Sequence, residues 1–406
     1  MFTNKGFFQS KKKYDNYYDI NNKTMFNNIT CNKWIVITTF NPPTSSIINL
    51  EKKIKDWKIV VIGNNETNKI KWNIFKFSTK LFYLSLDEQN FLNYNITNKL
   101  KPNSYYRKSI GYLYAIQHGA KEIYEIDDDI EINDTSYLNN NFGNVYVSYV
   151  NRNDSLMINP YSHFGETNIW PRGFKINDIG KQIKNDFGFV NSNNIDFKPL
   201  IFQGLINNNP DIDSIFYITR MKFKHIFNFN FPKLYPLIYF PHNYIPINSK
   251  NTRYLYDIFP FLMFPISYDE SIGDIWRGYL IQYFAWRMNG SVIYFSSEVK
   301  RTNKQKCCND IRAEKANFFG LTKYLDLLNS ILENDDNNKN MLETFNDFIK
   351  ILLSNKIIKH EDIIIFKTFL LDLSNIFSSS FFNSSVPCFT NTIMILFYIN
   401  NIFWIF

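Results

Sequence analysis

The chain has 406 residues, of which 45% are hydrophobic, 20% charged and 18% aromatic. This apolar content excludes a wholly disordered chain, and the length suits one large domain with an extension or two to three ordinary domains. Four cysteines are too few for a scaffold built on disulfides. The net charge of +8 is mild, and without a basic block it gives no indication of nucleic-acid binding.

The two termini are the segments that could serve targeting or membrane attachment. Residues 1–30 are polar and rich in Asn and Lys, and because they have no apolar core we expect a tail that is neither a signal peptide nor a membrane anchor. The apolar run at 392–406 is shorter than the roughly 20 residues that span a bilayer, and Asn400 and Asn401 interrupt it. It predicts a buried terminal helix or strand, with weak membrane association through the C-terminus as the alternative.

The first part of the chain alternates strands and helices. Apolar runs predict strands at 34–39, 58–62, 81–84 and 120–126. Helices are expected between them, the first capped by Thr44 or Ser45, a brief one opened by Asp87, and one from Ser104 to Gly119. This order implies right-handed crossovers, an α/β fold and a mainly parallel sheet.

The second part is less regular. Residues from about 140 to 260 are rich in loops, and a helix is then predicted at 274–287, closed by Gly290 and followed by a strand at 291–296. From about residue 311 onward the pattern is helical. We therefore divide the chain into a polar tail at 1–30, an α/β domain at 31–310 and a helical C-terminal extension at 311–406.

Polar residues follow several predicted strands. Thr38, Thr39, Gly63 and the triplet Asp127–Asp129 all lie where a strand ends. Ligands of open α/β sheets bind beyond the carboxyl ends of the strands, so we expect these residues to share one crevice.

The acidic triplet is the main chemical signal. Neighbouring carboxylates repel each other, and a divalent cation such as Mg²⁺ or Mn²⁺ removes that conflict. Alternation along an extended chain puts Asp127 and Asp129 on one side as the metal-facing pair, with Asp128 towards a ribose or serving the structure. A solvated acidic turn is the alternative.

Four further candidate residues lie on predicted helices. Arg107 and Lys108 begin a helix, where phosphate oxygens are favoured, although an ordinary surface pair has the same appearance. Asp274 is either an N-cap or a general base that activates an acceptor hydroxyl. Arg277, one turn on, is then expected near a phosphate or a carboxylate.

Four segments carry a family resemblance. They are Trp34-Ile-Val-Ile-Thr-Thr39, the run from Ser104 to Asp129, Ile169-Trp-Pro-Arg-Gly173 and Asp274-Ile-Trp-Arg-Gly278. In this order they resemble the STELLO family of glycosyltransferase-like proteins, and the part around Asp127–Asp129 is also similar to UDP-arabinopyranose mutases and self-glycosylating polypeptides. The resemblance implies a GT-A-like nucleotide-sugar fold over 31–310, a divalent metal at Asp127–Asp129, and a UDP-sugar held by Thr38, Thr39, Gly63 and Arg107.

Three functions are compatible with these residues. The first is a metal-dependent glycosyltransferase that moves a sugar from a UDP-type donor to a hydroxyl of a glycan or protein, with Asp274 as the base if the reaction inverts configuration. The alternatives are a non-catalytic scaffold that keeps the fold, and a UDP-sugar mutase or self-glycosylating protein. Plant members of the family are Golgi membrane proteins tied to cellulose synthase assembly, but this chain shows no matching N-terminal anchor, so its compartment stays open.

Overall fold

The computed structural model describes residues 29–381 with gaps at 66, 68, 134, 136–137, 139–143, 150–156, 166–168, 179–185, 192–197, 221–228, 240–241, 303–310 and 335–340. Nearly all of the expected polar tail and the whole apolar run at 392–406 lie outside the described residues.

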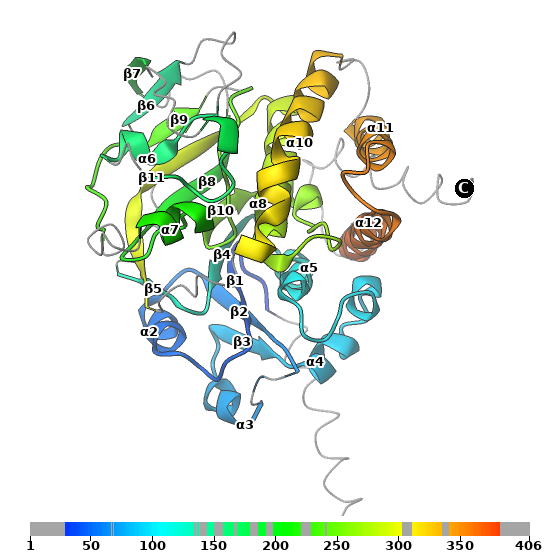
Figure 1. Ribbon diagram of the computed structural model, residues 1–406. Helices are drawn as coiled ribbons and strands as arrows, with labels where there is room; N and C mark the ends of the chain where they lie inside the picture. The colour runs from blue at the N-terminus through cyan, green and yellow to red at the C-terminus, as the bar shows by residue number, and fades with distance from the viewer. Residues whose placement is uncertain are drawn as a thin grey trace, which may run out of the picture.

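The described strands form one sheet in the order β3-β2-β1-β4-β10-β8-β11-β9-β6-β7, with β5 paired to β11 (Figure 1). Their bounds are β1 Lys33–Thr39, β2 Lys58–Gly63, β3 Leu81–Leu84, β4 Glu122–Asp127, β5 Ile130–Ile132, β6 Asn144–Tyr149, β7 Asp186–Asn191, β8 Lys198–Asn207, β9 Leu237–Tyr239, β10 Asn251–Leu255 and β11 Gly290–Arg301. The first four strands match the predicted ones closely.

The sheet is parallel on one side and mixed on the other. The neighbours β3, β2, β1 and β4 all run parallel, as the strand–helix alternation predicts. β10 runs antiparallel between β4 and β8, and further antiparallel pairs join β5 and β9 to β11 and β6 to β7. The expected mainly parallel sheet is therefore correct for the first half and has to be corrected to a mixed sheet for the second.

Alternate residues of the central strands face two separate cores. Trp34 and Val36 of β1 belong to a large cluster on one face, and Ile35 and Ile37 belong to a smaller cluster on the other. The smaller cluster includes Ile47 of the first helix. Because side chains alternate along a strand, an unbroken apolar run such as this one fits a strand that is covered on both faces.

The described helices and 3₁₀ turns connect and cover the strands. They are α2 Ser45–Lys53, α3 Lys69–Trp72, η1 Asn73–Phe75, α4 Leu86–Phe91, η2 Asn95–Asn98, η3 Tyr105–Arg107, α5 Lys108–Gln117, α6 Pro160–His163, η5 Ile176–Asp178, α7 Ser214–Arg220, η8 Tyr256–Phe261, α8 Glu270–Arg287, α10 Lys315–Glu333, α11 Met341–Ser354 and α12 His360–Phe381.

The helix ends agree with the sequence only in part. Thr44 caps α2, and Ser104 caps η3, which leads into α5. The cap of α4 is Ser85 rather than Asp87, because Ser85 forms a capping box with Glu88. α8 begins four residues earlier than predicted, at Glu270, and its cap is Asp269. Asn289, with φ 53°, takes the left-handed conformation after α8, whereas Gly290 already belongs to β11.

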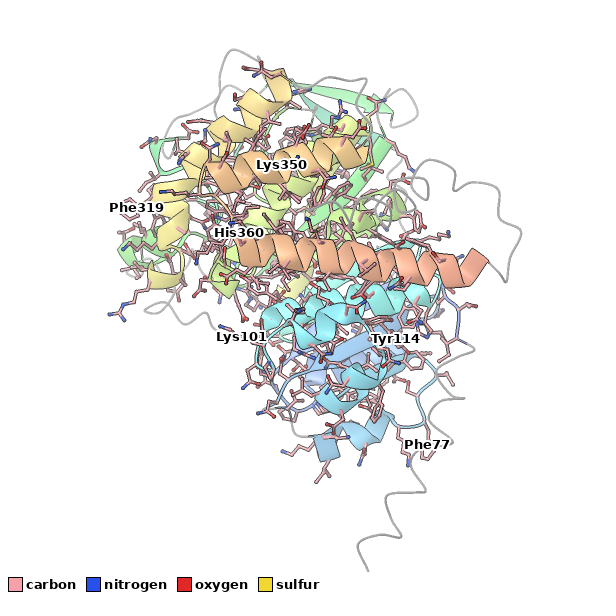
Figure 2. All side chains as sticks on the ribbon, turned by 90° about the vertical axis from the view of Figure 1, so that its right-hand side faces the viewer. Phe77, Lys101, Tyr114, Phe319, Lys350 and His360 are labelled. Carbon is pink, nitrogen blue, oxygen red and sulfur yellow. The ribbon has the colours of Figure 1, made fainter. Side chains whose placement is uncertain are left out.

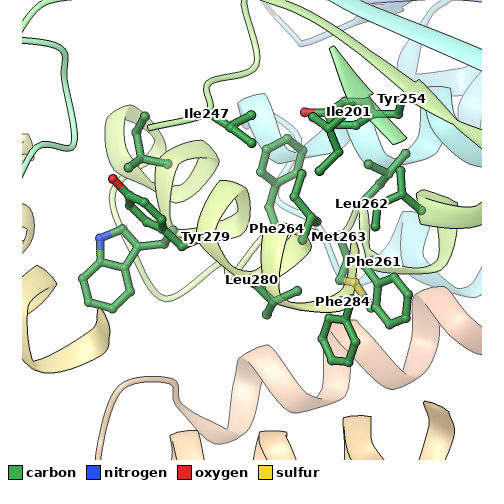
Figure 3. Packing of buried hydrophobic residues seen from close by; sticks show 14 of the residues in the cluster. Ile201, Ile247, Tyr254, Phe261, Leu262, Met263, Phe264, Tyr279, Leu280 and Phe284 are labelled. Atoms are coloured by element: carbon green, nitrogen blue, oxygen red, sulfur yellow. The ribbon is translucent and has the colours of Figure 1, made fainter. Parts of the chain in front are cut away.

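The C-terminal helices continue the larger core. Figure 1 shows α8 and α10 beside the strands, with α11 and α12 beyond them, and Figure 2 shows α11 and α12 from the outside. The ring of Phe284 in α8 stacks on the ring of Phe261, with the ring centroids 4.0 Å apart, in the cluster drawn in Figure 3. Asp372 of α12 accepts hydrogen bonds from the backbone N–H groups of Asn95 and Ile96, both at 2.9 Å. Helices α10, α11 and α12 thus follow the α/β part and share its core, while residues 382–406 of the expected extension lie outside the described residues.

Within the described ranges, the helices are all too short or too polar to cross a bilayer.

Candidate active site

Strand direction brings distant charged residues to one edge of the sheet. β4 ends in the acidic triplet, and antiparallel β10 begins beside that end, so Lys250 lies next to it. β8 runs antiparallel to β10, and β11 runs parallel to β8. The carboxyl ends of β8 and β11 therefore lie at the same edge of the sheet as the carboxyl end of β4. Arg301 of β11 pairs with Ile130, directly after the triplet. Sequence separation is therefore no guide to which charges meet here.

Asp127 is held by one hydroxyl and one ammonium group. Its Oδ1 accepts from Tyr105 Oη at 2.7 Å and from Lys108 Nζ at 3.1 Å. Lys108 also donates to the carbonyl oxygens of Ile126, at 3.2 Å, and Ser249, at 3.1 Å, and its side chain is fully buried. Asp127 keeps one-fifth of its side chain exposed. Lys108 thus lies at the site, as predicted. Its ammonium group, however, donates its protons to Asp127 and to carbonyl groups of the protein.

Asp128 points towards the end of β1. Its Oδ2 accepts from Thr39 Oγ1 at 2.5 Å and from Asn41 Nδ2 at 3.0 Å, and its backbone oxygen accepts from Thr44 Oγ1 at 2.7 Å. The predicted meeting of Thr39 with the triplet is therefore present. These contacts fix Asp128 in the wall of the site.

Asp129 faces the basic residues of the opposite strands. Arg301 Nε lies 3.6 Å from Asp129 Oδ2, and the Arg301 side chain is only 6% exposed. This Nε makes no hydrogen bond to any described residue. Lys250 is close enough to affect Asp129 electrostatically. Asp129 keeps one-fifth of its side chain exposed.

Two of the three carboxyl groups have a raised pKa, because their surroundings disfavour the ionised form. Burial raises the pKa of Asp128, and the hydrogen bonds from Thr39 and Asn41 offset this only in part. Burial also raises the pKa of Asp129. The positive charge of Arg301 lowers this pKa, and the negative charge of Asp127 raises it further. An additional positive charge at this edge would therefore stabilise the ionised triplet.

A second ion cluster, buried except at Lys250, joins Arg172, Asp211, Asp274 and Lys250. Arg172 donates to both oxygens of Asp274, at 2.8 Å each, and to Asp211 at 3.0 Å. Lys250 Nζ lies 2.5 Å from Asp211 Oδ1. Burial alone would raise the pKa values of Asp211 and Asp274, but Arg172 overrides it and both are lowered. Both carboxylates are thus held in the ionised state.

Ser249 joins the two clusters. Its backbone N–H and its hydroxyl contact Asp274 Oδ2 at 3.1 and 3.2 Å. The same hydroxyl lies 2.6 Å from Tyr105 Oη, which donates to Asp127. The Arg172 cluster therefore supports the residues that hold the triplet.

Thr38 and Gly63 lie at the expected strand ends, where their contacts are with neighbouring parts of the fold. Thr38 pairs with Asp127 in the register of β1 and β4, and its buried hydroxyl has no hydrogen-bond partner among the described residues. A Cβ on Gly63 would lie 2.3 Å from Tyr83 Oη, so glycine lets the Tyr83 ring lie against the backbone. Gln89 Nε2 donates to the Gly63 carbonyl at 2.8 Å.

The structure does not bring Arg107 or Arg277 to the triplet. Arg107 Nε donates to Gln89 Oε1 at 2.8 Å, and its NH1 group bonds the carbonyls of Thr97 and Leu100. Arg277 is fully buried and pairs with Glu125 Oε1 at 2.5 Å. Arg107 was expected near a phosphate, whereas its guanidinium group is bonded inside the protein. Arg277 was expected near a phosphate or a carboxylate, and it meets the buried carboxylate of Glu125.

Asp274 is neither the predicted N-cap nor an exposed acid. It lies in the second turn of α8, is 2% exposed, and has both carboxylate oxygens bonded to Arg172. A general base must reach the proton that it removes, and must have a pKa near the working pH. The burial and the lowered pKa of Asp274 both argue against that role.

Several residues of the site were missed by the sequence analysis. Arg172 stands in a quoted motif, but a single arginine gives no sign of two buried partners. Asp211 forms an Asp-x-Asp pattern with Asp213 after β8, which was a usable signal. Lys250 and Arg301 gave no signal in the sequence, because only the order of the strands brings them close to Asp129.

The donor set fits a hard cation that also binds a ligand. No described residue donates a hydrogen bond to Asp127 Oδ2 or to the carboxylate of Asp129. Mg²⁺ and Mn²⁺ prefer such oxygens. Within the part of the chain that the structure describes, no group of three or more His, Cys, Asp or Glu is arranged to hold a metal.

Comparison with known proteins gives two relatives. No protein-family model matches the chain. It is 35% identical over 284 residues, 67% of its length, to the probable glycosyltransferase STELLO2 of Arabidopsis thaliana. It is 34% identical over 289 residues, 68% of its length, to the probable glycosyltransferase STELLO1 of the same plant. The chain spans 36% of the length of each relative. The resemblance indicated by the motifs is thereby confirmed as homology to the STELLO proteins.

Proposed function

We propose that this chain is a metal-dependent glycosyltransferase that moves a sugar from a UDP-type nucleotide sugar to a hydroxyl of a glycan or protein. The observation that carries the proposal is the acidic triplet at the end of β4, facing Lys250 and Arg301, in a chain homologous to probable glycosyltransferases.

The order of the strands supports a GT-A-like fold. Four parallel strands in the order β3-β2-β1-β4 are followed by antiparallel β10, and the triplet lies where β4 meets that strand. The strand order reverses between β1 and β4, and ligands of open α/β sheets bind beyond the carboxyl ends of the strands at such a point. We therefore assign the nucleotide to the carboxyl ends of β1, β2 and β4.

Asp127 and Asp129 would hold Mg²⁺ or Mn²⁺. A bound cation would stabilise the charge that develops on the diphosphate as it leaves. The raised pKa values of Asp128 and Asp129 favour this assignment, because a cation would offset the cost of their ionisation.

Lys250 and Arg301 would contact the phosphate oxygens. Lys250 pairs with Asp211 at 2.5 Å but keeps one-fifth of its side chain exposed, and the buried Nε of Arg301 has no hydrogen bond to a described residue. A guanidinium group suits phosphate because its donors lie in a fixed fork. These two residues take the part that the sequence had suggested for Arg107 and Arg277.

Asp274 would act as a positioning residue rather than as a base. It orients Ser249, which contacts Tyr105, and Tyr105 holds Asp127. The hydroxyl of the acceptor would then lose its proton to another group, or late in the reaction to the diphosphate itself.

Hydrolysis or transfer of a panel of UDP-sugars in the presence of Mn²⁺ tests the proposal. The double variant Asp127→Ala/Asp129→Ala should lower the rate at least about a hundredfold. Asp326→Ala is the matched control and should keep the rate, because Asp326 of α10 is 62% exposed and its ion pair is with Lys175. An unchanged rate in the double variant would remove the metal role.

A further inference from the structure

Glu270 of α8 bonds a distant segment of the chain. Its Oε1 accepts hydrogen bonds from Ser104 Oγ at 2.5 Å and from the backbone N–H of Tyr105 at 2.9 Å, and these partners lie 166 and 165 residues away in sequence. An acidic residue in the first turn of a helix is favourable by itself, because the helix N-terminus carries partial positive charge. The cap of α8 is Asp269, which accepts from the Ser271 N–H at 3.0 Å. The two bonds that Glu270 accepts are therefore additional to the capping of its own helix.

These bonds fix the start of η3. Ser104 is the cap of η3, and its Oγ accepts from the Tyr106 N–H at 3.2 Å. Since this hydroxyl also donates to Glu270, it is bonded both as donor and as acceptor. Ser104 is only 4% exposed, so water competes little for these bonds. The backbone from which the Tyr105 side chain projects is thus held by a carboxylate of another helix.

The Tyr105 side chain connects this backbone to the acidic triplet. Its hydroxyl donates to Asp127 Oδ1 at 2.7 Å and lies 2.6 Å from Ser249 Oγ. Its ring meets the ring of Phe264 edge to face, with ring centroids 6.0 Å apart, and Lys108 Nζ lies 4.3 Å from the centroid of the Tyr105 ring. Because the ring is rigid and packed, a shift of the Tyr105 backbone would move the hydroxyl relative to Asp127.

α8 also acts on the Tyr105 hydroxyl from a second position. Residues 270 and 274 are four positions apart and so lie on the same face of the helix. Asp274 Oδ2 accepts from the backbone N–H and from the hydroxyl of Ser249, at 3.1 and 3.2 Å. Glu270 therefore fixes the backbone of Tyr105, while Asp274 fixes Ser249, which the Tyr105 hydroxyl contacts.

The position of this hydroxyl decides how Asp127 is oriented. Tyr105 and Lys108 both donate to Asp127 Oδ1, at 2.7 and 3.1 Å, and among the described residues none donates to Oδ2. We propose that Glu270 is a positioning residue for Asp127. By fixing the start of η3, it places the Tyr105 hydroxyl on Oδ1 and leaves Oδ2 to face a bound cation. This inference rests on the proposed metal-dependent function and adds to it a residue that touches neither the metal nor the substrate.

Calorimetric titration of UDP into the full chain, with and without Mn²⁺, tests the inference. The quantity compared is the ratio of the UDP dissociation constants without and with the metal. Glu270→Ala should lower this ratio about tenfold, because loss of a group that orients a metal ligand weakens metal binding by about 10- to 100-fold. Glu270→Gln should keep the ratio, since an amide Oε1 can accept the same two hydrogen bonds. Asp269→Ala is the matched control, because it removes one carboxylate and the cap of α8 while Glu270 keeps its bonds to residues 104 and 105.

Tyr105→Phe separates positioning from a general effect on the fold. It removes the hydroxyl through which Glu270 acts, so Glu270→Ala should lower the ratio no further in the Tyr105→Phe background. The inference is overturned if Glu270→Ala keeps the wild-type ratio or if Asp269→Ala lowers the ratio as much. It is also overturned if the effects of Glu270→Ala and Tyr105→Phe on the ratio multiply.

Failure of the proposed metal site would give a different result, because Mn²⁺ would then make no difference to UDP binding by wild type. In that case urea unfolding of wild type, Glu270→Ala, Tyr105→Phe and the double variant decides whether Glu270 positions Tyr105. A coupled pair gives non-additive unfolding free energies, and additive values would overturn the inference. Circular-dichroism melting curves should show that Glu270→Ala folds, because Glu270 is partly exposed.

Discussion

The buried Arg172 cluster makes the most specific prediction about stability. Arg172→Met removes the guanidinium group and keeps much of its volume. Asp274, 2% exposed, then loses both of its charge-assisted hydrogen bonds, whereas Asp211 keeps Lys250 at 2.5 Å. One buried carboxylate is thereby left without a counter-ion, which costs about 3–5 kcal/mol.

The loss should depend on pH. Arg172 lowers the pKa of Asp274, so in the variant burial dominates and the pKa rises. Native Asp274 then binds a proton more readily than unfolded Asp274 does. The destabilisation is therefore expected to be smaller near pH 4 than near pH 8.

Urea unfolding followed by far-ultraviolet circular dichroism measures both effects. Lys198→Met is the control, because Lys198 and Asp257 form an exposed pair at 3.2 Å that contributes only about 0–1 kcal/mol. If Arg172→Met loses no more stability than Lys198→Met, or loses the same amount at both pH values, the assignment of a buried ion cluster is refuted.

Three further predictions concern other parts of the molecule. Burial raises the pKa of Glu314 from 4.5 to about 7. The wild-type unfolding free energy should therefore fall by about 3 kcal/mol as pH rises from 4.5 to 7. Glu314→Gln should remove that slope in urea titrations, and an unchanged slope would contradict the assignment. Gly63→Ala forces a Cβ to 2.3 Å from Tyr83 Oη. It should cost about 1–3 kcal/mol in the same assay, and a stability equal to wild type would refute the clash. Lys250→Met/Arg301→Met should raise the KM for a UDP-sugar at least about tenfold, and an unchanged KM would exclude a phosphate contact.

The first half of the fold was predictable because its strands are apolar throughout. β1 and β2 are buried on both faces and read as unbroken runs of Ile and Val. β8 and β10 were missed, because Gln203 in β8 and Thr252 in β10 are polar. These side chains are buried and bond each other at 2.9 Å, so their polarity is satisfied inside the sheet. A single sequence does not indicate such pairs.

The site was predictable to the same extent. The triplet and Thr39 follow apolar strands, and the rule that parallel strands end at one edge brought them together correctly. Arg277 was expected near a phosphate or a carboxylate, and it does meet a carboxylate, but this is Glu125 inside β4, which the sequence did not indicate as its partner. Lys250 and Arg301 depend on the antiparallel strand β10 and on β11, whose places in the sheet were not predicted.

The most direct measurement is a calorimetric titration of UDP into the full chain with and without Mn²⁺. Asp127 and Asp129 are predicted to share the ion with the diphosphate, so UDP should bind at least about tenfold more weakly without Mn²⁺. Asp127→Asn/Asp129→Asn should abolish the difference made by the metal. Binding of UDP that is equally tight with and without Mn²⁺, or no binding in either case, would contradict a metal-dependent nucleotide-sugar site at the end of β4.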